Sequence, residues 1–273
     1  MKSGYDFVTK LHRLGPGPTA EQLDGHYRRM QAWDISKGIG QAMGSKYLFD
    51  SFWPQTYHGL KKIMDDPVTR PDMIIADFFV EAASDIHFEY KFPVAIVAPN
   101  MPVFQLPCSY IPGQPGFQLP GTMTSEDAPM WLRIMNEIFF VPDLPAIIRA
   151  GKWSQKMRSD NGVFHPPHKP SKPDYLFFVN SFFGLEIPRD LPPTAAPVGP
   201  LLSPTYQPLD QECGAFLASH RSVLYIALGT HIILPHEDAA KILDGVNRLK
   251  EDGLIDGVIW AMGKTCRADL DRR

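Results

Sequence analysis

The sequence predicts an α/β fold built as two Rossmann-like domains, and three observations lead to this prediction. Short apolar runs end in a polar residue or a turn signal, as buried parallel strands do. Segments that suit helix separate these runs, which is the alternation that forms βαβ units. A proline-dense stretch over residues 188–208 divides the alternation in two, because proline fixes φ and donates no amide hydrogen bond. We therefore expect a first domain over residues 1–190, an extended interdomain linker over 191–210 and a second domain over 211–273.

The first domain is expected to form one βαβ unit and then a third strand. Pro71-Asp72 supplies a turn signal before the first apolar run, and Pro99 ends the second. In chain order, the expected elements are helical sequence over 24–66 with a break near 36–44, a strand over 73–76, a helix over 81–90, a strand over 94–97, a long loop over 99–129, helices over 130–140 and 146–159, and a strand over 175–179.

The second domain is expected to contain a strand over 223–228, a helix over 235–250 and a strand over 258–261. Pro235 suits a first helical position, and Glu237 and Asp238 lie in the first turn, where negative charge complements the helix dipole. Two strands do not bury both faces of a sheet. We therefore expect this domain to be incomplete.

Composition excludes several classes of function. A hydrophobic fraction of 44% with 21% charged residues is typical of a folded globular protein. The net charge of −3 argues against nucleic-acid binding, which normally needs a basic surplus. Three widely spaced cysteines form no metal-binding pair, which favours a reduced, cytoplasmic compartment. The sequence has no signal peptide and no apolar run long enough to span a membrane.

Three segments occur in an order and spacing that resemble the UDP-glycosyltransferases with the GT-B fold. The first is Pro71–Phe79, which carries Asp77 at the end of a strand, and the last is Val223–Thr230, a strand with a Gly-Thr loop. Between them, Asn180–Glu186 and Val198–Pro200 are similar to the interdomain passage of that family. The resemblance covers nearly the whole chain and is to the fungal glucosyl- and glucuronosyltransferase branch.

The resemblance implies two Rossmann-like domains that face each other across a cleft. The first would hold a small lipophilic acceptor and the second a UDP-sugar, which is a co-substrate, so that no cofactor and no metal is implied. A histidine near the N-terminus would act as general base on an acceptor hydroxyl, and an aspartate would orient the histidine. Imidazole suits this task because its pKa lies near neutrality.

Asp77 matches the orienting aspartate of the family. It follows a strand, and open α/β sheets place functional groups at the carboxyl ends of their strands. The structural alternative is an acid that only caps the next helix.

Gly229 and Thr230 match the loop that approaches the donor phosphates, because glycine permits close backbone approach and a hydroxyl can donate to phosphate. The alternative is an ordinary strand-to-helix turn. In the loop over residues 99–129, Phe104, Tyr110 and Phe117 are candidates for the wall of the acceptor site.

Two departures from the family pattern concern activity. No strand and glycine loop precede His12 or His26, so both are interpreted as surface histidines and neither as the base. The donor signature with a His-Cys-Gly core does not occur after Trp260. We therefore expect both domains to be incomplete, and the chain by itself to show neither turnover nor UDP binding.

The competing hypothesis is a non-catalytic α/β protein that binds a ligand or a partner. Membrane association of a full-length form stays open.

Two other patterns are set aside. Gly38–Gly44 resembles a dinucleotide-binding loop, but no convincing strand precedes it. His165 and His168 flank two prolines without a carboxylate or thiol nearby in the sequence, which argues against a metal site.

Overall fold

The computed structural model divides the chain into two compact units. Unit 1 comprises Met1–Pro18 and Asp34–Leu202, and unit 2 comprises Thr19–Trp33 and Ser203–Arg273. The residues that the structure describes are 12–34, 38, 40, 43–100, 129–138, 141–166, 174–185, 191–203, 206, 208–229, 232–263 and 267. The division between Leu202 and Ser203 falls inside the expected linker. The domain limits expected from the sequence stay a prediction.

Unit 1 contains a four-stranded parallel sheet in the order β1-β2-β3-β4. Its strands are β1 (Ile74–Asp77), β2 (Val94–Ala98), β3 (Leu176–Val179) and β4 (Ala195–Pro197). The first three confirm the expected strands to within one residue at each end. The fourth was not expected, because it lies in the proline-rich stretch. Pro197 is tolerated there since β4 is an edge strand, where a missing amide donor costs no ladder bond.

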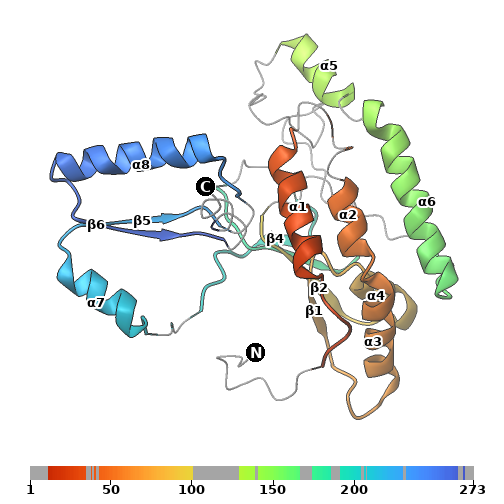
Figure 1. The fold of residues 1–273 in the computed structure, drawn as a ribbon. Helices are drawn as coiled ribbons and strands as arrows, with labels where there is room; N and C mark the ends of the chain where they lie inside the picture. The colour runs from red at the N-terminus through yellow and green to blue at the C-terminus, as the bar shows by residue number, and fades with distance from the viewer. Residues whose placement is uncertain are drawn as a thin grey trace. The chain divides into compact units, whose positions relative to one another are not determined.

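The helices of unit 1 that the structure describes lie beside these strands (Figure 1). They are α2 (Met43–Asp50), α3 (Trp53–Asp65), α4 (Ala82–Tyr90), α5 (Met130–Ile138), the short 3-10 helix η3 (Val141–Asp143) and α6 (Leu144–Asp160). The β1–α4–β2 segment is the expected βαβ unit. Its helix ends at Lys91, whose φ of 51° is left-handed and stops the helix.

Two buried clusters make up the core of unit 1. One lies around the sheet and includes Ile96, Phe177 and Val179. The other joins α3 to α4 through Trp53, Tyr57 and Ile86. The second cluster lies beside the loop that follows β1, so it supports the site described below.

Unit 2 contains α1 (Ala20–Ala32), α7 (Gln211–Ser219), β5 (Val223–Ala227), α8 (His236–Glu251) and β6 (Gly257–Ala261). The two strands pair in parallel, and α7 and α8 flank the pair (Figure 1). The expected strands and helix are confirmed with one change: Pro235 is the residue that caps α8 and has extended ψ of 149°, so the helix begins one residue later.

Candidate functional site

Asp77 lies at the carboxyl end of β1, as the sequence predicted, and its side chain is exposed. Its Oδ1 accepts a hydrogen bond from the Phe79 amide at 3.0 Å. This bond closes a local turn and differs from the helix cap considered as the alternative, because α4 begins at the N-cap Glu81. Among the described residues, Asp77 forms no ion pair with a histidine. Because the side chain is exposed, its second oxygen can accept a hydrogen bond from another group.

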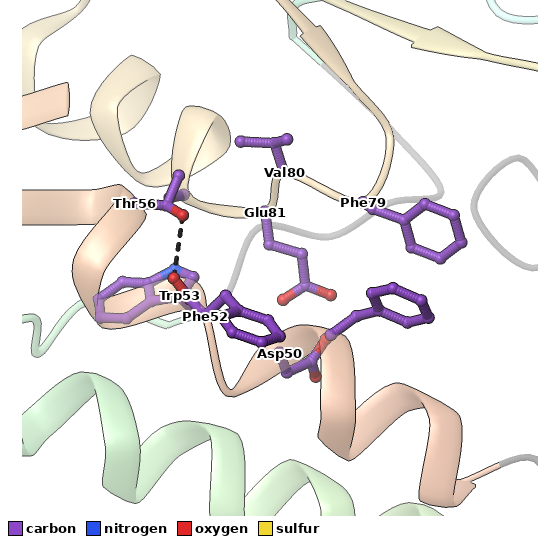
Figure 2. A pocket seen from close by; sticks show the side chains of 9 residues that line it. Asp50, Phe52, Trp53, Thr56, Phe79, Val80 and Glu81 are labelled. Carbon is purple, nitrogen blue, oxygen red and sulfur yellow. Dashed lines mark hydrogen bonds between the residues drawn. The ribbon is translucent and has the colours of Figure 1, made fainter. Parts of the chain in front are cut away.

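An aromatic hollow of about 160 Å³ lies next to this turn, between the α2–α3 junction and the β1–α4 loop. Figure 2 shows the side chains that line it. The Phe49 and Phe79 rings stack at 5.1 Å between centroids. The indole of Trp53, which is 4% exposed, forms part of the inner wall. The hollow was not predicted, because residues 49–53 and 79–82 meet only after folding.

Charged groups close one side of the hollow. Lys46 Nζ lies 2.7 Å from Asp50 Oδ2 and 3.1 Å from Glu81 Oε1. Burial raises the pKa of the Asp50 carboxyl, and the nearby Glu81 carboxylate raises it further, against the opposing effect of Lys46. Burial lowers the pKa of Lys46, but Glu81 and Asp50 outweigh that effect, so the pKa is raised overall. The ammonium group is thereby held in its charged form between two acids.

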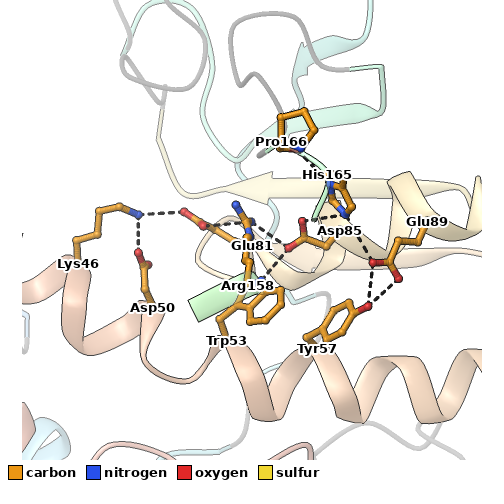
Figure 3. A network of polar contacts seen from close by, with 10 residues as sticks. All are labelled: Lys46, Asp50, Trp53, Tyr57, Glu81, Asp85, Glu89, Arg158, His165 and Pro166. Carbon is orange, nitrogen blue, oxygen red and sulfur yellow. Dashed lines mark hydrogen bonds and ion pairs between the residues drawn. The ribbon is translucent and has the colours of Figure 1, made fainter. Parts of the chain in front are cut away.

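A buried ion pair lies behind the hollow and continues this chain of charges (Figure 3). Asp85 is 1% exposed, and its Oδ2 accepts from Trp53 Nε1 at 2.8 Å and from Arg158 at 2.9 Å. Burial raises the pKa of Asp85, while Arg158 and the Trp53 hydrogen bond act in the opposite direction. The guanidinium of Arg158 also lies 3.7 Å from Glu81 Oε2. Trp53 is thus held in place by the same acid that pairs with Arg158.

His165 belongs to the far end of this network. Its Nε2 lies 3.7 Å from Asp85 Oδ1 and 3.6 Å from Glu89 Oε1. Glu89 in turn accepts from the Tyr57 hydroxyl at 2.7 Å, and burial, followed by this bond, raises the pKa of Tyr57. Within the described residues, no group of three metal-ligating side chains comes together. His168 lies outside those residues.

Asp85 and Arg158 were missed by sequence reasoning. An aspartate inside the small apolar run of α4 was the available signal, since a buried acid needs a partner. The partner comes from α6, which is 73 residues away in the sequence. Nothing in local spacing identifies it.

The glycine loop that resembled a dinucleotide site is occupied by a side chain of the protein itself. The Gly40 amide donates to Asp143 Oδ1 at 3.0 Å. A β-carbon on Gly38, whose φ is 95°, would lie 2.6 Å from Asp143 Oδ2. The two glycines therefore let the backbone close around a buried carboxylate, which agrees with setting the motif aside.

Gly229 follows β5 in unit 2 and is exposed with a φ of 78°. A β-carbon at this position would meet no atom within 4 Å, so the glycine serves the backbone conformation and not a close internal contact. Thr230 lies outside the described residues, as do Phe104, Tyr110 and Phe117, so their predicted roles stay predictions.

The two early histidines differ from each other. His12 is exposed, as expected. His26 is buried with 4% exposure on α1, so the prediction of a surface position is wrong. His26 is the one buried residue of α1, and the polar residues on either side of it gave no sign of its burial.

No family model matches the chain. It is 40% identical over 273 residues to a UDP-glycosyltransferase of Fusarium mangiferae, covering 99% of this chain and 49% of the relative. It is 42% identical to a UDP-glycosyltransferase of Talaromyces amestolkiae, covering 96% and 50%. Among solved structures, the glycotransferase of kitacinnamycin matches with a TM-score of 0.50 at 14% identity, covering 84% of this chain and 51% of that one. The chain thus spans about half the length of the relatives it matches.

The fold is that of the GT-B glycosyltransferases, with parallel sheets in an α/β arrangement. The resemblance seen in the sequence is confirmed: over nearly its whole length, the chain is similar to proteins named UDP-glycosyltransferases. Within the described ranges, no helix combines the length and the apolar character needed to cross a bilayer.

Proposed function

We propose that the residues of this chain serve in the transfer of a hexose from a UDP-sugar to a hydroxyl of a small lipophilic acceptor. The observation that carries the proposal is the homology, at 40% and 42% identity, to proteins named UDP-glycosyltransferases. The position of Asp77 at the carboxyl end of a parallel strand supports it, because that edge of the sheet is where such folds bind ligands.

Asp77 is proposed to orient the imidazole that removes the acceptor proton. Its Oδ1 is engaged by the Phe79 amide, which fixes the carboxylate, and Oδ2 can accept from the imidazole N–H. The acceptor oxygen then attacks the anomeric carbon, and UDP leaves with the bonding electron pair from the opposite side. A carboxylate in this place stabilises the imidazolium that forms, as it does in hydrolase triads.

Gly229 and Thr230 are proposed to approach the donor diphosphate. The exposed position and positive φ of Gly229 support this role, because no atom lies within 4 Å of the place where a β-carbon would sit and a ligand could therefore approach the backbone there.

The decisive experiment is a chimera in which this chain replaces the homologous half of the Fusarium mangiferae relative. Product formation from UDP-glucose and UDP-glucuronic acid with phenolic and alcohol acceptors is measured by mass spectrometry. We expect a hexosylated product, and we expect Asp77→Asn to lower kcat about 100- to 10,000-fold, as loss of a triad carboxylate does. Asp72→Asn is the matched control on the exposed turn before β1 and should leave kcat unchanged.

Several outcomes would count against the proposal. A folded chimera without turnover would do so, as would turnover that does not depend on Asp77. Calorimetry with UDP then tests whether the chain by itself binds the nucleotide. The expectation drawn from the sequence is that the chain alone shows no UDP binding and no turnover. A folded but inactive chimera would favour the hypothesis of a non-catalytic binding protein.

A further inference from the structure

The aromatic hollow beside Asp77 has the size of one substituted ring. Its volume of about 160 Å³ is close to the roughly 150 Å³ that is sufficient to hold benzene in a protein interior. The Phe49 and Phe79 rings stack on each other, and Phe79 keeps 57% of its surface exposed. A further planar ring packs favourably against exposed aromatic surface, in an offset or edge-to-face arrangement. Shape and lining therefore favour a flat ring over a branched aliphatic group.

Glu81 supplies a partly exposed hydrogen-bond acceptor at this hollow. Its Oε1 accepts from Lys46 Nζ at 3.1 Å. Its Oε2 has Arg158 at 3.7 Å, which is an ion-pair contact but too long for a hydrogen bond. Figure 2 shows the carboxylate directed toward Asp50 and the Phe52 ring, on the inner side of the hollow. One carboxylate oxygen is thus left for a donor on a ligand.

The surrounding charges decide what kind of donor fits. Lys46 and Arg158 both lie against Glu81, while Lys46 is also paired with Asp50 and Arg158 with the buried Asp85, so both cations are already shared between two acids. A cationic ligand would compete with Lys46 and Arg158 for these carboxylates. A neutral hydroxyl can donate to Oε2 without disturbing either ion pair. A hydrogen bond from a neutral donor to a carboxylate is also stronger than one to a neutral acceptor.

The hollow is held rigid from behind. Arg158 links Glu81 to the buried Asp85, and Asp85 accepts from the indole of Trp53, which is itself a wall of the hollow. The acceptor oxygen and the aromatic wall are therefore positioned by one network.

We propose that this hollow binds a hydroxyl-bearing aromatic ring of the acceptor, with Glu81 as the specificity-determining residue that accepts a hydrogen bond from the ring hydroxyl. The inference rests on the proposed function, because it assigns the ring to the acceptor of that reaction. It adds a recognition contact on the β1–α4 loop, separate from the hydroxyl that receives the sugar.

The test compares phenol with toluene, which has the same shape and no donor. Each is titrated into the full chain while the tryptophan indole N–H signals are followed by NMR. The chain has five tryptophans, of which Trp53 alone lines the hollow, so a ligand in the hollow shifts one indole signal selectively. Phe164→Leu is a matched control, since Phe164 is 81% exposed and outside the hollow.

We expect phenol to shift the Trp53 signal and to bind about 10-fold or more tightly than toluene, the ratio that one hydrogen bond to a charged group supports. Glu81→Gln should remove most of that preference while toluene binding persists, which also shows that the variant is folded. Phe79→Leu should weaken both ligands, and Phe164→Leu neither. Equal affinity for the two ligands, a Trp53 signal that stays unchanged at saturation, or an unaltered preference in Glu81→Gln would overturn the proposal.

This test is independent of the donor and of turnover. Selective phenol binding together with an inactive chimera would retain the ring site and refute the proposed reaction. An active chimera without phenol binding at Trp53 would retain the reaction and refute the ring site.

Discussion

The two sheets of this protein come from the same kind of sequence and reach different degrees of burial. In unit 1, Ala95 and Ala98 of β2 and Val179 of β3 are fully buried. In unit 2, every residue of β5 is at least partly exposed, and Tyr225 at its centre keeps 65% of its surface exposed. Both sequences read as runs of apolar residues in a βαβ alternation.

The difference comes from the number of strands and from what covers them. Parallel strands are normally buried on both faces, and the unit 1 sheet has four of them with helices around it. The described part of unit 2 has a two-stranded sheet, and two strands offer too little area to bury each other. An apolar run therefore predicts a strand, whereas its burial depends on the neighbours that the rest of the structure supplies.

Truncating one aromatic ring in each sheet tests this comparison most directly. Phe177→Ala in β3, where the ring is 2% exposed, should cost about 3–5 kcal/mol because it leaves a cavity. Tyr225→Ala in β5 should change the free energy of unfolding by only about 0.5 kcal/mol, as exposed substitutions do. Urea denaturation of both variants measures the two changes. Similar losses would show that the two sheets are equally buried in solution.

Breaking the buried ion pair of unit 1 should be nearly as costly. Arg158→Met leaves Asp85 buried without its cation, which should cost about 3 kcal/mol or more. Burial raises the pKa of Asp85, so its ionised form is favoured less in the folded than in the unfolded chain. The loss should therefore grow as the pH rises through that pKa and shrink when Asp85 is protonated.

Urea midpoints at pH 7 and pH 4.5 measure the effect of Arg158→Met. Arg149→Met on the same helix is the control, because Arg149 is exposed. A loss that does not depend on pH would mean that the cost of Arg158→Met comes from packing and not from the unpaired acid.

A substitution that disturbs the close backbone packing at the end of the unit 1 sheet is expected to have a smaller effect on stability. A β-carbon on Gly199 would lie 2.4 Å from the Asn180 carbonyl carbon and from the Ser181 nitrogen, so Gly199→Ala should cost about 1–3 kcal/mol. Gly151→Ala in α6 meets no atom within 4 Å and should instead stabilise by about 0.5–1 kcal/mol through helix propensity. Thermal melts of the two variants should shift in opposite directions, and a shift in the same direction would contradict the contact at Gly199.

The smallest expected effect concerns the acid that joins the two strands of unit 2. Hydrogen bonds from the Arg221 and Ser222 amides lower the pKa of Asp256. Its contribution to stability is therefore present above the unfolded pKa of about 3.9 and is lost as the pH falls through the folded value. Asp256→Asn should lower the melting temperature at pH 6, and the difference in melting temperature between the variant and the unmodified chain should become smaller below about pH 4. A difference that stays constant with pH would rule out this ionic contribution.

Several features of unit 1 could be predicted because the information is local. The turn at Pro71-Asp72, the apolar run and the small residues of α4 specify the β1–α4–β2 unit and place Asp77 at the end of its strand. β4 was not predicted, because the high proline content of this segment indicated a linker, whereas the edge of a sheet tolerates proline. The burial of His26 was not predicted, because the polar and charged residues around it in the sequence indicate an exposed position.

The sequence by itself determined the α/β class, five of the six strands that the structure describes and the resemblance to UDP-glycosyltransferases. Each of these depends on residues that are neighbours in the sequence, where periodicity and turn chemistry act directly. Only the tertiary structure decided that Asp85 pairs with Arg158, that Asp143 occupies the glycine loop and that Glu81 lies at an aromatic hollow. These contacts join segments many residues apart, and which partners meet depends on how the helices pack on the sheet.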